Sequence, residues 1–217
     1  MAFLQTSIRS GYITDLVLPP AQEGQDPATI LEQGLAAIFA SIHSPTTMIN
    51  LNPLVQSVNQ IPESDPKCVD YREIAPTFDI ALDAPYVMLT QDDLDPKANT
   101  ISTNGFRQFE IVDKLNIGFG MSQNLVYHAA IRQTRFGMET FTNAGSGVVI
   151  FGRWEIKVGD GGRVINIIEK NVVRCNLLLS WYIRSTIDKS HAEAHAKLKE
   201  KWIVRMKEVG FDPIPRN

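Results

Sequence analysis

The second half of the chain consists of alternating apolar and polar residues followed by one long helical pattern. Side chains alternate between two faces over four stretches, and a shorter stretch between turns adds a fifth: 106–117, 125–136, 139–142, 148–158 and 163–178. Alternation with glycine-rich turns is typical of antiparallel strands that bury one face. Residues 177–209 then predict a helix that terminates at Gly210. This order predicts an α+β fold in which a curved antiparallel sheet wraps around a long C-terminal helix.

The first half of the chain predicts fewer regular elements. We expect a strand over 12–18, a helix capped by Asp26 with Pro27 at its first position, a short helix or turn at 46–50, and a strand at 54–60. Residues 69–74 are interpreted as a further strand. Over 78–104, prolines and an acidic run interrupt the hydrophobic periodicity that a strand or a helix would show. This segment is therefore either a surface insertion or a lid over a ligand site.

Composition excludes several classes of function. The 217 residues include 21 Lys and Arg and 24 Asp and Glu, which gives a formal net charge of −3. The sequence contains no clustered basic stripe. We therefore expect no nucleic-acid partner, and a membrane-recruited module is disfavoured for the same reason. Without a signal-peptide pattern or an apolar run of roughly 18 residues, we expect no integral membrane segment. The two cysteines form no disulfide or metal motif, so the chain is predicted to be a single cytoplasmic domain over 1–217.

The histidines give weak signals. His191 and His195 share one helical face, but a zinc-protease motif needs a glutamate where Ala192 stands, so they predict a solvated face. His128 and Arg132 lie on a polar strand face and are expected to be exposed, with an anion-binding or proton-transfer pair as the alternative. His43 is interpreted as the end of the first helix. With no nucleotide, flavin or nucleophile motif either, we expect no metal and no cofactor.

Three polar residues fall on strand faces that the alternation assigns to the interior. Asp113 lies on the apolar face of its stretch. Glu169 and Asn171 share a face with Ile165 and Val173, opposite residues such as Lys170 that mark the solvent side. A buried carboxyl group needs a hydrogen-bond partner or becomes neutral. Each acid is therefore either a general acid/base or ligand-orienting group, or a structural acid that arginine or backbone N–H groups satisfy.

Large aromatic residues recur at strand and helix spacings. They are candidates for the wall of an apolar pocket, or alternatively for a plain hydrophobic core. The candidates are Tyr71, Tyr127, Trp154, Trp181 and Tyr182.

Three strings carry a resemblance to known proteins. MINLNPLV at 48–55, FEIVD at 109–113 and RCN at 174–176 resemble a fungal family of domains of unknown function within the START-like, helix-grip (SRPBCC) superfamily. The likeness spans about residues 12–207, and the 78–104 segment departs from the family pattern. The resemblance implies an internal apolar cavity between the sheet and the C-terminal helix. Proteins of this fold carry lipids, sterols or hormones, and some cyclise polyketides without a cofactor.

Together these observations favour a cofactor-independent cyclase or isomerase with a small hydrophobic substrate. Its substrate would be a polyketide- or terpene-derived intermediate of fungal natural-product biosynthesis, and a pericyclase such as a Diels–Alderase is one form of it. In this hypothesis Asp113, Glu169 and Asn171 polarise or orient the substrate, and the aromatic residues bind it. The alternative is a non-catalytic carrier of a lipid, a sterol or another small hydrophobic ligand.

Overall fold

The seven described strands form one antiparallel sheet. The computed structural model describes residues 4–82, 104–118 and 121–213. The sheet order is β1-β7-β6-β5-β4-β3-β2, so the first two strands of the chain lie at opposite edges. The strands are β1 (Gln5–Val17), β2 (Val55–Ile61), β3 (Arg107–Gly118), β4 (Met121–Thr134), β5 (Gly137–Gly145), β6 (Val148–Gly159) and β7 (Val164–Asn176).

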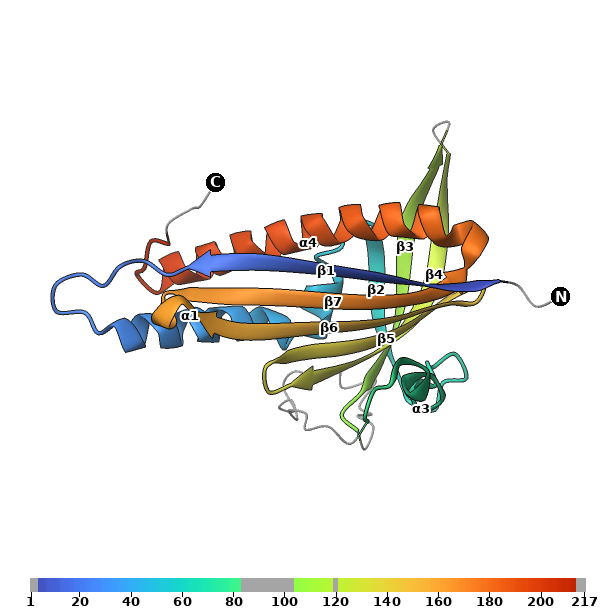
Figure 1. Ribbon diagram of the computed structural model, residues 1–217, viewed down its shortest axis with the longest axis horizontal. Coiled ribbons are helices and arrows are strands. Elements are labelled where there is room, and N and C mark those ends of the chain that lie inside the picture. Colours follow the sequence, from blue (N-terminus) through green and yellow to red (C-terminus); the bar gives the residue numbers. More distant parts are fainter. Residues whose placement is uncertain (1–3, 83–103, 119–120, 214–217) are drawn as a thin grey trace.

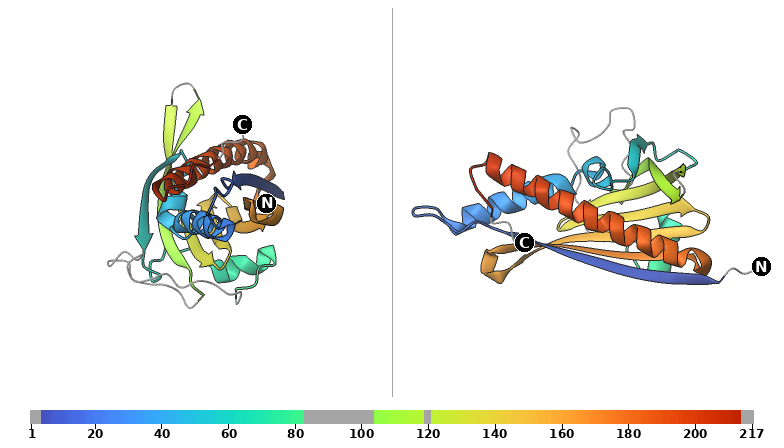
Figure 2. Two further views of the ribbon diagram at one scale, coloured as in Figure 1. Left: turned by 90° about the vertical axis from the view of Figure 1, so that its left-hand side faces the viewer. Right: turned by 90° about the horizontal axis from the view of Figure 1, so that it is seen from above.

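The helices lie on both faces of this sheet. They are α1 (Pro27–Ile42), α2 (Pro45–Ile49), α3 (Tyr71–Ile74) and α4 (Ser180–Glu208). The sheet curves around α1 and α4, and α4 crosses it diagonally (Figures 1 and 2). The prediction of an α+β fold with an antiparallel sheet and a long C-terminal helix is therefore confirmed. None of the described helices is long and apolar enough to cross a bilayer.

The start of α1 and the end of α4 lie where the sequence predicts, whereas α4 begins at Ser180, after a short 3-10 turn over Leu177–Leu179. Asp26 accepts a hydrogen bond from the Ala28 N–H at the start of α1, with a proline at the first helical position. At the other end of the chain, α4 stops before Gly210, whose φ of 87° is accessible to glycine at little cost. The capping signals of the sequence therefore set both the entry into α1 and the exit from α4.

The larger core lies between the concave face of the sheet and the two long helices. The indole N–H of Trp202 in α4 donates a hydrogen bond to the carbonyl oxygen of Gly34 in α1, at 3.0 Å. Both residues pack over the inward side chains of β7, such as Ile165 and Ile167. A Cβ atom at Gly34 would lie 2.6 Å from a Leu18 methyl group and 3.0 Å from an Ile165 methyl group, so a larger residue here would require both side chains to shift.

A second core covers the convex face of the sheet. Tyr71 of α3 packs there on Phe106, which in turn contacts Phe141 of β5 and, through it, Phe151 of β6. The prediction of a strand over 69–74 is wrong. The side chain of Gln108 bonds both backbone groups of Val69, each at 3.0 Å, and so replaces the strand partner that this segment would need.

The second core also overturns the expected exposure of Arg132. Its side chain is fully buried, pairs with Glu139 at 2.7 Å and donates to the carbonyl oxygens of Ala81 and Leu82. His128 is half-buried, at 3.3 Å from Glu110. The alternation assigned the two to one face correctly, but the segment around α3 covers that face. Most of the predicted 78–104 lid or insertion, residues 83–103, lies outside the described residues.

His43 ends the first helix, as predicted, because it is the C-cap residue of α1. The ring atom Nε2 lies 3.1 Å from the Thr134 carbonyl oxygen, and the ring packs at a tilt against Phe39, with centroids 4.9 Å apart. Burial lowers the pKa of His43, although the Thr134 carbonyl opposes the shift. The ring therefore acts as a packed, neutral contact between α1 and β4 rather than as a charge at the helix end.

Candidate functional site

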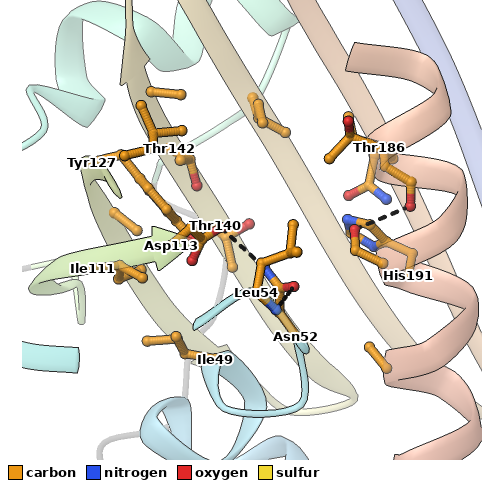
Figure 3. A pocket seen from close by; sticks show the side chains of 18 of the residues that line it. Ile49, Asn52, Leu54, Ile111, Asp113, Tyr127, Thr140, Thr142, Thr186 and His191 are labelled. Carbon is orange, nitrogen blue, oxygen red and sulfur yellow. Dashed lines mark hydrogen bonds between the residues drawn. The ribbon is translucent and has the colours of Figure 1, made fainter. Parts of the chain in front are cut away.

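A pocket lies between the concave face of the sheet and α4. Its volume is about 280 Å³, at the lower end of the roughly 300–1,000 Å³ that small-molecule pockets occupy. Most of the wall is apolar, with isoleucine, leucine, methionine and alanine side chains from α2 and strands β3 to β6. Two polar centres interrupt this wall on opposite sides (Figure 3).

The first polar centre is built around Asp113 of β3. Tyr127 of β4 donates a hydrogen bond to Oδ1 at 3.2 Å, and the Asn52 amide donates to Oδ2 at 3.4 Å (Figure 3). The Asn52 Oδ1 accepts from the Leu54 N–H, which fixes the amide orientation. Burial raises the pKa of Asp113 to about 6, against the opposing effect of the two hydrogen bonds. This carboxyl group therefore exchanges its proton close to neutral pH.

The second polar centre is built around Glu169 of β7, which is 1% exposed. Nδ1 of His191 lies 2.6 Å from one carboxylate oxygen, and Nε2 of His195 lies 3.2 Å from the other. Burial by itself raises the pKa of Glu169, but the hydrogen bonds to the two histidines outweigh it and lower the pKa below the ordinary value. Glu169 is therefore a carboxylate that both rings hold in place.

The surroundings of the two histidines fix the rings. Trp154 stacks on His195 with ring centroids 4.7 Å apart, and Tyr12 of β1 stacks on His191 at 5.7 Å. The Thr14 hydroxyl lies 2.7 Å from Nδ1 of His195. Because a carboxylate only accepts hydrogen bonds, each ring donates to Glu169. In neutral His191 this leaves the lone pair on Nε2, in a residue that lines the pocket.

Asn171 adds an incompletely bonded amide to the second centre. Its side chain is 3% exposed and lines the pocket. Nδ2 reaches no acceptor within hydrogen-bond distance among the described residues, although it is close enough to Glu169 to favour the charged carboxylate. Buried amide N–H groups normally have a partner, so a ligand oxygen would complete this site.

The structure brings most of the predicted site residues together. Asp113, Glu169 and Asn171 face inward, as the alternation predicts, and their chemical roles stay predictions. The residues of the predicted set that line the pocket are Asp113, Glu169, Asn171, Tyr127, Trp154 and Tyr182.

Two of the predicted aromatic residues lie elsewhere. Tyr71 belongs to the convex core, because residues 71–74 form a helix on that face. Trp181 is 74% exposed. Successive helical residues point about 100° apart, so Tyr182 enters the pocket while its neighbour points to solvent. Neither Tyr71 nor Trp181 is a pocket residue.

The prediction of a solvated face at His191 and His195 is wrong. His195 is buried, and both rings bond Glu169. A signal for this was present, because Ile187, His191, Ala194 and Leu198 continue one helical stripe at three- to four-residue spacing. In the described residues no group of three or more His, Cys, Asp or Glu side chains has a geometry that would hold a metal ion.

The comparisons with known proteins identify the family. Residues 27–203 match a family described as "Domain of unknown function (DUF7053)". The chain belongs to this family. No curated protein matches the chain.

A solved structure shares a remote similarity with this member of the DUF7053 family. The crystal structure of TTHA0849 from Thermus thermophilus aligns with a TM-score of 0.42 at 9% identity, over 92% of this chain and 98% of that one.

Proposed function

We propose that this protein is a cofactor-independent isomerase or cyclase that acts on a small hydrophobic molecule by proton transfer. The observation that carries the proposal is the arrangement of the pocket. An apolar wall separates a buried carboxyl group, Asp113, whose pKa is about 6, from a histidine that a buried carboxylate orients. General acid/base catalysis needs a donor and an acceptor with pKa values near the working pH on two sides of one substrate.

The two centres have complementary roles in this proposal. Nε2 of His191 removes a proton from a substrate carbon, and the charge of Glu169 stabilises the imidazolium that results. On the other side, Asp113 gives its proton, or a hydrogen bond, to the substrate oxygen on which negative charge develops. In an isomerisation the imidazolium of His191 gives its proton to a different carbon, while the substrate oxygen returns its proton to Asp113 as the carbonyl group re-forms. In a cyclisation the enol carbon instead attacks a second carbonyl carbon of the same molecule, whose C=O π bond breaks. The resulting alkoxide takes the proton from His191, and Asp113 recovers its own proton.

The fold and the family resemblance add finer parts to the same proposal. A sheet curved around a long C-terminal helix supports a helix-grip, START-like fold with a ligand cavity. Substrates derived from polyketides or terpenes, in the cytoplasm of a fungus, fit the resemblance carried by residues 48–55, 109–113 and 174–176. The pocket volume of about 280 Å³ favours a compact ring system over a long acyl chain.

A deuterium experiment tests the chemistry while the identity of the substrate is still open. The protein is purified from a fungal host and incubated in D₂O with its co-purified small molecule. The molecule is then extracted, and its deuterium content is measured by mass spectrometry. We expect deuterium on carbon with the wild-type protein and with Glu200→Gln, an exposed control on the same helix as His191. Asp113→Asn and His191→Gln should each lower the exchange rate by roughly two orders of magnitude or more.

A binding measurement separates lost chemistry from a lost pocket. The neutral fluorophore N-phenylnaphthylamine should bind the wild type, Asp113→Asn and Glu200→Gln with similar affinity, because the apolar wall is unchanged. If the molecule extracted from the wild type and from every variant contains no deuterium, the result indicates the alternative function, a non-catalytic carrier.

A further inference from the structure

An exposed apolar patch surrounds the start of α4. Leu178 and Trp181 are 77% and 74% exposed, and Leu177 and Leu179 lie beside them in the preceding turn. Leu4, also largely exposed, adjoins this turn, because its carbonyl oxygen accepts a hydrogen bond from the Leu177 N–H at 3.0 Å. We call these five residues the leucine patch. Large apolar side chains gathered in this way on a surface usually mark an interaction site.

The leucine patch adjoins the pocket. Tyr182 and Ile183, the next residues of α4, line the pocket together with Val148 of β6. Figure 1 shows the start of α4 and the start of β1 at the same end of the molecule. A surface that contacts the leucine patch therefore lies next to the first residues of the pocket wall.

Arg184 is an exposed cation on the first turns of α4, beside the leucine patch. On the same side of the helix Asp188 accepts a hydrogen bond from Tyr12 at 2.8 Å, whereas Lys170 and Arg174 of β7 belong to the opposite face of the sheet, where Arg174 lies over the Phe78 ring. Arg184 follows Trp181 by three residues, so the two share one side of the helix. Leucine and tryptophan beside arginine are the side chains that favour the interface of an anionic bilayer.

We propose that the leucine patch and Arg184 dock this protein on the surface of an anionic phospholipid membrane. The apolar side chains enter the boundary between headgroups and acyl chains, and the guanidinium group contacts phosphate. A second copy of the chain docked on the same patch is the competing occupant, and the sedimentation measurement below distinguishes it from a membrane. The proposal holds whether a ligand in the pocket is converted or only carried, and it would let a hydrophobic ligand enter from the bilayer.

Vesicle flotation with the full chain tests this proposal. The probes are vesicles of phosphatidylcholine alone and of phosphatidylcholine with roughly one third phosphatidylserine. We expect the wild type to float with the anionic vesicles and Leu178→Glu to lose this binding by about tenfold or more. Arg184→Glu should lose binding to anionic vesicles, with no change on neutral ones. Phe136→Glu, at an exposed apolar residue on the turn between β4 and β5, is the matched control and should float like the wild type.

Stability and mass measurements complete the test. The substituted side chains are exposed, so thermal melting of the variants should match that of the wild type. The proposal is overturned if the wild type binds neither vesicle, or if Leu178→Glu floats as well as Phe136→Glu. It is also overturned if the wild type sediments as a dimer that Leu178→Glu dissociates, because the patch would then be a contact between copies.

Discussion

The two faces of the sheet bury charged side chains in different ways. On the convex face, Glu139 accepts hydrogen bonds from Arg132 at 2.8 Å and from Arg153 at 2.7 and 3.0 Å. The rest of the Arg132 guanidinium group donates to the carbonyl oxygens of residues 81 and 82 and lies over the Phe106 ring. The buried side-chain nitrogen and oxygen atoms of this network all have a hydrogen-bond partner among the described residues. Such completeness is what a structural role requires.

On the concave face the polar groups are only partly bonded. Asp113 has a pKa raised towards neutrality, and the Nδ2 atom of Asn171 has no acceptor within hydrogen-bond distance among the described residues. Both line a pocket, whereas the convex network lies under packed aromatic rings. The two faces therefore differ in how completely their buried polar groups are hydrogen-bonded. The groups on the convex face stabilise the fold, and in the proposed function those on the concave face contact the ligand.

The largest effect expected from this comparison is at Arg132. Arg132→Met leaves the buried Glu139 with one cation and removes the donors to two carbonyl groups, so we expect a loss of about 3–5 kcal/mol in the free energy of unfolding. Urea denaturation measures it. N-phenylnaphthylamine should still bind the folded variant, because the pocket lies on the other face. Arg135→Met, an exposed neighbour, is the control and should change stability by less than about 0.5 kcal/mol. A folded Arg132→Met variant that no longer binds the probe would contradict the conclusion that the convex face is structural and separate from the pocket on the concave face.

A smaller loss is expected at Glu169. Glu169→Gln removes the charge that both histidines bond, and we expect a loss of about 2–3 kcal/mol at neutral pH. The histidines lower the pKa of Glu169 in the folded protein. Its stabilisation is therefore present above the ordinary pKa of 4.5 and is lost as the pH falls through the lowered folded value. The difference between the wild type and Glu169→Gln in urea should shrink on acidification, and Glu200→Gln should show no such change.

Asp113→Asn should shift stability in the opposite direction. The folded pKa of about 6 lies above the ordinary 3.8, so ionised Asp113 destabilises the fold at pH values above about 6 and has no such effect below about 4. We expect Asp113→Asn to gain about 1–2 kcal/mol near pH 7.5, after the loss of one hydrogen bond, and to gain nothing near pH 4. Thermal melting at the two pH values measures this. A loss of stability at both would show that Asp113 is a structural acid like Glu139.

Strand alternation was sufficient to predict much of the site, because a two-residue period decides which face a side chain takes. It placed Asp113, Glu169 and Asn171 on the concave face and Arg132 on the convex one. It contains no information on what covers each face. The burial of Arg132 depends on the segment around α3, whose packing comes from contacts distant in sequence.

The histidines were missed for a related reason. His191 continues an apolar stripe of α4, but both histidines also have polar neighbours in the sequence, and the position of Glu169 on the facing strand is what makes them its partners. Trp181 and Tyr182 are neighbours in sequence, and the rotation of the helix against the sheet decides which one enters the pocket. Both outcomes depend on how α4 is placed on the sheet, which periodicity alone does not determine.

The smallest effects are expected from a matched pair of tyrosines, one on each face. The hydroxyl groups of Tyr71 and Tyr127 each donate a hydrogen bond of 3.2 Å to a carboxylate, of Glu63 and Asp113 respectively. Each change to phenylalanine should cost about 1 kcal/mol or less in urea denaturation. Their effects on titration should differ. The bond from Tyr127 opposes the burial that raises the pKa of Asp113, so Tyr127→Phe should move this pKa above about 6.

Carbon-13 NMR of aspartate-labelled protein follows this titration directly. In Tyr127→Phe the deuterium exchange of a bound ligand should change its pH dependence together with the Asp113 carboxyl signal, since the proposal makes Asp113 the acid. In Tyr71→Phe both should stay at their wild-type values, because the Glu63 contact lies on the convex side. Suppose that in Tyr127→Phe the NMR titration of Asp113 shifts but the pH dependence of deuterium exchange does not. The acid in the reaction is then a group other than Asp113.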